Sequence, residues 1–141
     1  MIGKWFEGSK EYSTLIIRIG VGVVFVFYGA QKLFGMFGGA GISGTTAGFA
    51  SMGFPAPGVM AVLAGVGELL GGLLVLPGII TRYAAGTLLV IMLVAMFVVH
   101  WKHGFAAMAF PFAMAMMAGS LVVSGGGRAS VDKIIKIDER V

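Results

Sequence analysis

Four long apolar runs dominate the hydrophobicity pattern of this sequence. Each run is about as long as a bilayer-crossing helix, which needs roughly 20 apolar residues; the runs cover residues 14–34, 59–78, 82–100 and 105–124. The second and third runs are joined by a very short connection, so these two helices are expected to be antiparallel neighbours. The pattern predicts an all-α integral membrane four-helix bundle in which residues 1–141 form a single domain.

The longest connection, residues 35–58, contains eight glycines and no charged residue. Residues 45–52 are predicted to form a short helix that stops at Gly53 and the Phe54-Pro55 pair after it. The aromatic and methionine side chains of this connection are too apolar for a freely solvated loop. Two interpretations remain, an interfacial linker, which is favoured, and a lid across the mouth of the bundle.

The tail, residues 128–141, follows a glycine-rich stop after the fourth run. Ser130 is expected to cap a short helix there. Val131, Ile134 and Ile135 fall on one side of that helix, so the tail is predicted to be amphipathic.

Composition narrows the class of protein further. Hydrophobic residues make up 58% of the chain and charged residues 11%, which excludes an ordinary soluble domain. Cysteine is absent, so disulfides, cysteine-ligated iron–sulfur clusters and a thiol redox relay within this chain are excluded. The net charge of +4 lies mainly at the two ends and indicates topology and anionic lipid rather than nucleic acid.

The positions of lysine and arginine predict the orientation of the bundle. With four spans, most cations fall on one side of the membrane: Lys4, Lys10, Arg82, Arg128, Lys133, Lys136 and Arg140. The other side carries Lys102, with Lys32 at a helix end. The positive-inside rule therefore places both termini in the cytoplasm and the connections 35–58 and 100–104 outside.

Glu68 is the candidate functional residue with the clearest physical argument. It is the only acidic residue between Glu11 and Asp132, and it lies near the middle of the second run. A carboxylate there costs a few kcal/mol at least, so it must be paired, protonated, or turned toward protein or water. Small residues share its helix face: Ala61, Ala64, Gly65, Gly71 and Gly72. Glu68 is either a proton-active or ligand-binding carboxyl, or a packing acid that ties two helices together.

Two cations of the first run are possible partners of this acid. Arg18 lies about one turn inside the membrane and Lys32 lies near the far end of the run. Either side chain can snorkel to its nearer interface or turn inward to Glu68, which lies roughly 10 Å away in depth on helix rise alone. Snorkelling is favoured for Lys32, and both alternatives stay open for Arg18.

The last two runs carry further candidate chemistry. His100 and His103 lie one helical turn apart at the end of the third run, suited to proton relay or metal binding. Two ligands without a third make metal binding the weaker alternative, and no metal site is predicted. Pro111 predicts a kink or an early break in the fourth helix. Four methionines there fill an irregular core or contact a flat apolar ligand.

In this order, the landmarks resemble the DoxX family of small four-helix membrane proteins. The resemblance covers most of the chain and rests on short pieces: Arg18 with Gly22, residues 28–33 (YGAQKL), residues 53–57 (GFPAP), residues 68–74 (ELLGGLL), Gly78, Thr81-Arg82, His100 and residues 125–132 (GGGRASVD).

The resemblance implies a bacterial or archaeal plasma membrane and a link to quinone-dependent oxidoreductases, among them a thiosulfate:quinone oxidoreductase subunit. Glu68 and His100 would then handle protons, while Arg18 or Lys32 would polarise a quinone carbonyl. The cofactor-binding positions would be Lys32, Tyr28, Gly71 and Gly72. The partners would be the lipid bilayer and either oxidoreductase subunits or further copies of the chain. The alternatives are a membrane assembly factor, chaperone or scaffold, and a small proton-coupled transporter.

Overall fold

The computed structural model describes residues 9–136 and is helical throughout its regular structure. Its α-helices are α2 (Lys10–Phe34), α3 (Gly41–Ser51), α4 (Pro57–Val75), α5 (Thr81–Val94), α6 (Phe105–Ser124) and α7 (Val131–Ile134). Four helical stretches are long and apolar enough to cross a membrane: Tyr12–Phe34, Pro57–Val75, Thr81–His103 and Phe105–Ser124. The predicted all-α membrane protein with four spanning helices is therefore confirmed.

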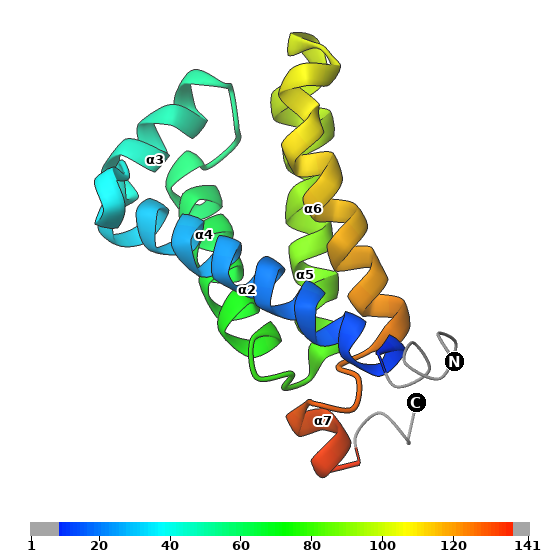
Figure 1. Cartoon of the computed structure of the whole chain (residues 1–141). Helices are drawn as coiled ribbons and strands as arrows, with labels where there is room; N and C mark the ends of the chain where they lie inside the picture. The colour runs from blue at the N-terminus through cyan, green and yellow to red at the C-terminus, as the bar shows by residue number, and fades with distance from the viewer. Residues whose placement is uncertain (1–8, 137–141) are drawn as a thin grey trace.

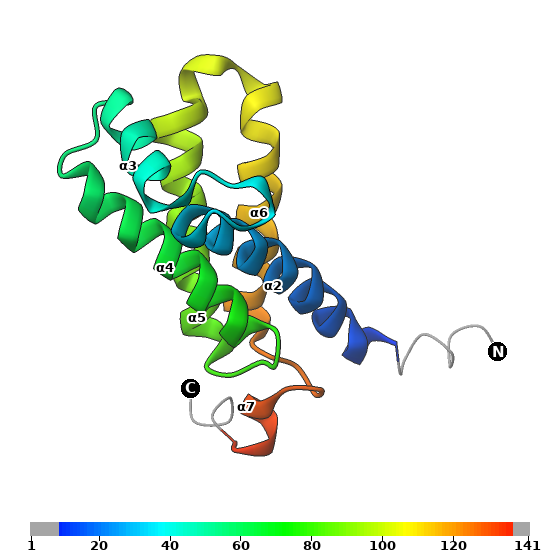
Figure 2. The same cartoon turned by 90° about the vertical axis from the view of Figure 1, so that its left-hand side faces the viewer.

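The four spanning helices form two pairs. Helix α2 packs along α4 and α5 packs along α6, and the two pairs converge near α7 and diverge at the opposite end (Figure 1). A second view shows α2 running obliquely across the bundle beside α4 (Figure 2). We call the end near α7 the converging end and the opposite end the diverging end. Because there are four spans, the first span begins and the last span ends at the same end of the bundle. Which side of the membrane this end faces stays a prediction.

Glycines bring α2 and α4 into backbone contact. A Cβ at Gly29 would lie 2.5 Å from the backbone nitrogen of Leu69, and one at Gly72 would lie 2.8 Å from the nitrogen of Val26. No side chain fits at such distances, so the close approach depends on glycine at both positions. The small-residue face predicted for α4 is confirmed, because Ala61, Gly65, Gly71 and Gly72 are buried.

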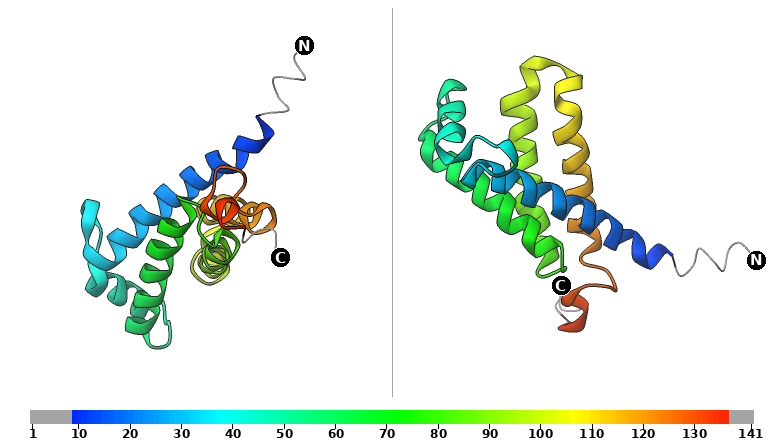
Figure 3. Two further views of the ribbon diagram at one scale, coloured as in Figure 1. Left: turned by 90° about the horizontal axis from the view of Figure 1, so that it is seen from below. Right: turned by 60° about the vertical axis from the view of Figure 1, so that its left-hand side comes forward.

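The hydrophobic core lies where the pairs meet. Phe25 and Val21 of α2 pack there against Leu88 of α5 and Leu121 of α6, with alanines of α5 and α6 filling the narrow space between them. The view from below shows α2 and α4 fanning away from the α5/α6 pair (Figure 3). The core therefore joins the pairs at one end and leaves them separated at the other.

Two local features differ from the predicted elements. The third span changes winding near its end, where α5 is followed by a π-helix, η2 (Ala95–His100), and a 3-10 turn, η3 (Trp101–His103). Helix α6 passes through Pro111 and continues to Ser124, so the early break considered for that position does not occur. Pro111 is past the first turn and has no N–H to offer the carbonyl of Ala107, yet the helix continues through it.

The connection 35–58 is folded against the bundle. After a 3-10 turn, η1 (Met36–Gly38), α3 begins four residues earlier than the helix predicted at 45–52. The Thr45 hydroxyl donates to the carbonyl of Lys32 at 3.2 Å and fastens α3 to the end of α2. The rings of Phe49 and Phe54 stack with centroids 4.9 Å apart. This segment therefore forms part of the wall at the diverging end.

Candidate functional site: an ion pair in an intramembrane cavity

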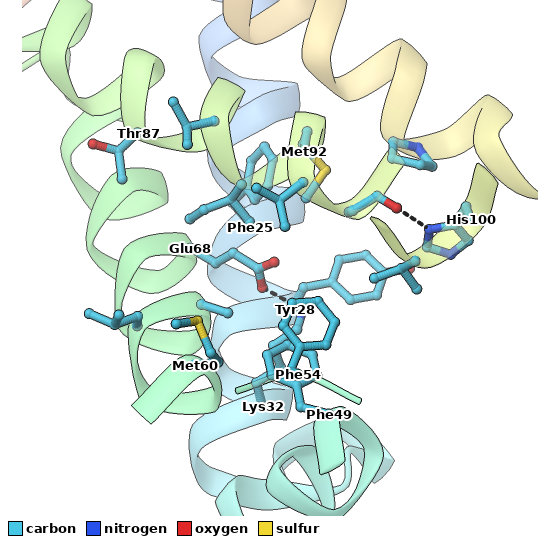
Figure 4. A pocket seen from close by; sticks show the side chains of 18 of the residues that line it. Phe25, Tyr28, Lys32, Phe49, Phe54, Met60, Glu68, Thr87, Met92 and His100 are labelled. Atoms are coloured by element: carbon cyan, nitrogen blue, oxygen red, sulfur yellow. Dashed lines mark hydrogen bonds and ion pairs between the residues drawn. The ribbon is translucent and has the colours of Figure 1, made fainter. Parts of the chain in front are cut away.

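A cavity of about 820 Å³ opens between the two helix pairs at the diverging end. Most of its lining is apolar, with aliphatic side chains and methionines that come mainly from α4, α5 and η2. Aromatic rings add flat walls and polar side chains are few; the aromatic residues are Phe25, Tyr28, Phe49, Phe54 and Phe110, and the polar ones are Lys32, Glu68, Thr87 and His100 (Figure 4). This volume and mixture are typical of a small-molecule site.

Lys32 and Glu68 form an ion pair on the cavity wall. Lys32 Nζ donates to Glu68 Oε2 at 2.6 Å, and the side chains are 26% and 3% exposed, respectively. The snorkelling favoured for Lys32 is therefore wrong, and the inward alternative holds. The oblique course of α2 brings its last turns beside the middle of α4, which removes the separation in depth expected for upright helices.

Two glycines set the distance between these charged side chains. Gly29 precedes Lys32 by three residues and packs on the backbone of Leu69, while Gly65 precedes Glu68 by three residues and packs on the side chain of Leu33. Residues three apart share a helix face. Each glycine therefore clears the space beside one member of the pair.

Only one oxygen of the Glu68 carboxylate is engaged by protein. Oε2 accepts from Lys32, whereas Oε1 has no hydrogen-bond partner among residues 9–136. Among residues 9–136, Thr81 Oγ1 is the only side-chain polar atom that is both fully buried and without a hydrogen-bond partner. The unpartnered Oε1 of Glu68 is therefore not fully buried. Oε1 therefore faces the cavity, beside Lys32 and Tyr28 (Figure 4).

Tyr28 lies next to the ion pair and reaches across to α6. Lys32 Nζ is 5.5 Å from the centroid of the Tyr28 ring, a distance at which the ring face stabilises a cation. The same ring contacts that of Phe110, with centroids 5.5 Å apart. Tyr28 therefore both flanks the charged pair and closes the cavity between α2 and α6.

His100 lines the opposite wall and its ring is oriented by the π-helix. Its Nδ1 lies 2.8 Å from the carbonyl oxygen of Ala95, five residues earlier, which is the spacing that π winding brings together. A carbonyl only accepts, so Nδ1 carries a proton, and the neutral ring then keeps Nε2 as an acceptor. His103 is oriented separately, by the carbonyl of Val99 at 3.2 Å.

Arg18 lies away from the site to which the sequence analysis assigned it. It does not line the cavity and does not pair with Glu68; its side chain is 2% exposed at the converging end. Its guanidinium donates to four backbone carbonyls, those of Val75, Leu76, Gly126 and Ala129, at 2.7–3.1 Å. The structure therefore does not bring Arg18 together with Glu68 and His100 as the assigned catalytic role requires, because its donors hold the end of α4 and the chain after α6.

Asp132 completes this second polar group and was missed as a key residue. Its carboxylate accepts from the backbone nitrogens of Ile80 at 2.6 Å and Thr81 at 2.8 Å, which lie at the start of α5. A carboxylate satisfies the free N–H groups of a helix start and complements its dipole. Ser130 caps α7 as predicted, accepting from the nitrogen of Lys133. We call Arg18, Ser130 and Asp132, with the backbone they bind, the basal cluster.

Gly71 and Gly72 also need correction as cofactor-binding positions. A Cβ at Gly71 would lie 2.7 Å from the side chain of Leu88, and Gly72 faces the backbone of α2. Neither residue lines the cavity. Both are helix-packing positions, whereas Tyr28, Lys32, Glu68 and His100 are brought together around one space.

These features define a multi-pass membrane protein with a polar pair inside an apolar cavity. The model of the DoxX family matches residues 13–101, which is more than half of the chain, and the chain belongs to the DoxX family. It is 29% identical over 128 residues to the protein of Bacillus subtilis (strain 168) named "Putative oxidoreductase CatD", covering 90% of each chain. No solved structure matches this chain.

Proposed function

We propose that this protein is the membrane subunit of a quinone-linked oxidoreductase system and binds the quinone head group in the cavity beside Lys32 and Glu68. The observation that carries the proposal is the ion pair with one open carboxylate oxygen, set in the wall of an apolar cavity among membrane-spanning helices. The name of the Bacillus subtilis relative supports the oxidoreductase class.

The cavity residues suit a quinone in shape and polarity. A quinone head group is a flat ring with carbonyl acceptors at opposite ends. The rings of Tyr28, Phe49 and Phe54 supply flat apolar surface, and the ammonium of Lys32 supplies a donor for one carbonyl. A volume of about 820 Å³ accommodates such a ring with part of a tail.

The ion pair is suited to moving protons without leaving an isolated charge in the membrane. When bound, a quinone accepts two electrons and two protons. Lys32 and Glu68 stand side by side as donor and acceptor, so a proton exchanged through Glu68 is balanced by a change in its bond to Lys32. His100, with its Nδ1 proton held by Ala95, provides a second exchange position on the other wall. The electrons come from a partner protein, because this cysteine-free chain supplies no thiol relay.

The proposal includes an orientation. With both termini in the cytoplasm of a bacterial or archaeal cell, the cavity lies toward the outer leaflet of the plasma membrane. The one-sided distribution of lysine and arginine supports this placement.

Quinone binding to purified protein in lipid nanodiscs tests the function. In a Trp5→Phe background, Trp101 adjoins His100 and reports binding of a short-chain quinone by fluorescence quenching. Lys32→Met removes the carbonyl donor and is expected to raise the Kd at least tenfold, a loss of about 1.4 kcal/mol or more. The matched control is Lys102→Met, an exposed lysine outside the cavity. Equal affinity of the wild-type and Lys32→Met proteins would overturn the assignment.

A small proton-coupled transporter is the second candidate, because the same titratable pair lies in a cavity that opens toward one end of the bundle. It predicts proton flux into proteoliposomes that Glu68→Gln abolishes, without any bound quinone. An assembly or scaffold role instead predicts stable co-purification with another membrane subunit and no dependence on Glu68.

A further inference from the structure

The walls of the cavity differ in how they are closed. Helices α2 and α4 meet backbone to backbone at Gly29 and Gly72, and α5 packs along α6. Between α2 and α6, the rings of Tyr28 and Phe110 touch across the gap. The remaining side, between α4 and α5, is closed over only part of its length.

Close packing between α4 and α5 is confined to the half nearer the converging end. There, Cβ atoms at Gly71 and Gly67 would each lie 2.7 Å from a side chain of α5, Leu88 and Ile91, respectively. Toward the diverging end, beyond these contacts, two aliphatic side chains line the cavity and are also exposed: Leu63 of α4, 60% exposed, and Val94 of α5, 42% exposed. We call these two residues the α4/α5 opening.

This opening faces hydrocarbon rather than water. Leu63 lies six residues from the first residue of α4, and Val94 nine residues from the last residue of the third span, His103, roughly 9 and 14 Å along the helices from the diverging end. Both helices are long and apolar enough to cross a membrane, so their middle turns lie at the depth of the acyl chains. Both side chains of the opening are aliphatic.

We propose that the α4/α5 opening is a tail subsite, through which the ligand enters the cavity sideways from the bilayer. The head group then lies against Lys32 and Glu68, and a hydrocarbon tail passes between Leu63 and Val94 into the lipid. The ligand class is accordingly a membrane-resident amphiphile with a flat head and a long prenyl or acyl tail. This inference rests on the proposed function and adds the access route and the tail to it.

The absence of cysteine from the chain allows a reversible test in the folded protein. In the variant Leu63→Cys with Val94→Cys, a short thiol-reactive cross-linker bridges the opening, and a reductant cleaves the bridge. Two probes with the same head group are compared in nanodiscs: a long-tailed ubiquinone and a tail-less dimethoxy-methyl-benzoquinone. Bridging is expected to slow loading of the long-tailed probe at least tenfold, with recovery on reduction, while binding of the tail-less probe changes less than twofold.

A matched control places cysteine at Leu73, which is exposed on α4 but lies outside the cavity lining, and treats it with the same reagent. Loading should not change there. Unchanged loading of the long-tailed probe into the bridged protein would overturn the tail subsite while leaving the proposed function intact. Failure of both probes to bind the wild-type protein would overturn the proposed function and the tail subsite with it.

Discussion

The bundle places charged side chains in two buried settings that share almost no chemistry. In the basal cluster, Arg18 directs its donors at four carbonyls and Asp132 accepts from two backbone nitrogens. In the cavity, Lys32 and Glu68 have each other, and one oxygen of the acid faces open space. A charge bound entirely by backbone is fixed in place and unavailable to a ligand. A charge with an open oxygen stays available, which is why we assign function to the cavity and stability to the basal cluster.

Glycine serves the two settings differently. Beside the cavity, Gly29 and Gly65 let two helices approach. In the basal cluster, a Cβ at Gly78 would lie 2.5 Å from the Cβ of Ser130, so glycine there makes room for a loop that folds back. Ile80, which follows this turn, adopts a φ of +42°, a conformation that costs a β-branched residue about 1–3 kcal/mol. The hydrogen bond from Ile80 to Asp132 holds that conformation in place.

The largest loss of stability is expected from Arg18→Met. The substitution keeps apolar volume but leaves four carbonyls without their donor, at a cost of about 3 kcal/mol or more. Reversible unfolding in mixed detergent micelles measures the effect, with Lys102→Met as the exposed control. An ordinary hydrogen bond contributes about 1 kcal/mol to stability. A free energy of unfolding that falls by less than this amount would show that Arg18 does not hold the converging end.

The next largest effect is expected from Gly29→Ala, which connects the two regions. A Cβ 2.5 Å from the Leu69 nitrogen must push α2 away from α4, for a loss of about 2 kcal/mol together with separation of Lys32 from Glu68. The variant should therefore lose quinone affinity as well as stability. Gly20→Ala is the matched control on the same helix, because nothing lies within 4 Å of a Cβ there. Equal behaviour of both variants would count against the close approach.

A smaller loss is expected from Asp132→Asn. The amide keeps one oxygen acceptor for the start of α5 but loses the charge and places an NH₂ group against a backbone donor, for about 1–2 kcal/mol. Quinone affinity should not change, because the basal cluster lies away from the cavity. Hydrogen exchange at the amides of Ile80 and Thr81 reports the change directly. Protection equal to wild type at both amides would contradict the cap.

The smallest effect on stability, and a large one on activity, is expected from Glu68→Gln. Glutamine relieves the desolvation of the carboxylate, and its amide oxygen still accepts from Lys32, whose 26% exposed side chain can be hydrated, so the free energy of unfolding should change by less than about 1 kcal/mol. The amide cannot exchange protons, so quinone-linked activity should fall at least tenfold. Combining Glu68→Gln with Lys32→Met should cost less than the sum of the single variants. Full activity with glutamine at this position would leave the acid as a packing residue.

How far the sequence predicts this molecule depends on the kind of interaction. Apolar runs and the small-residue face of α4 follow directly from periodicity, and both are confirmed. Snorkelling was favoured for Lys32 because it lies near the end of its run, whereas the tilt that packing gives α2 brings that end beside Glu68. The partners of Arg18 are backbone carbonyls, which leave no signature in residue identity.

The site shows the same division. Glu68, Tyr28 and His100 were predicted as candidates and line one cavity. The methionines that line it, Met52, Met60 and Met92, lie outside the cluster noticed in the fourth run. The π winding that orients His100 is a change of helical register that no residue type marks. Both the methionine lining and the orientation of His100 depend on how segments distant in the sequence pack together, which residue types alone do not predict.

The carbonyls that bind Arg18 have a consequence for the order of events during synthesis. Arg18 enters the membrane with the first span, yet two of its four acceptors, Gly126 and Ala129, belong to residues translated after the last span. Until those residues have been synthesised, only the carbonyls of Val75 and Leu76 are available to the guanidinium. A product truncated before Gly126 therefore lacks two of the four acceptors of a cation in the first span.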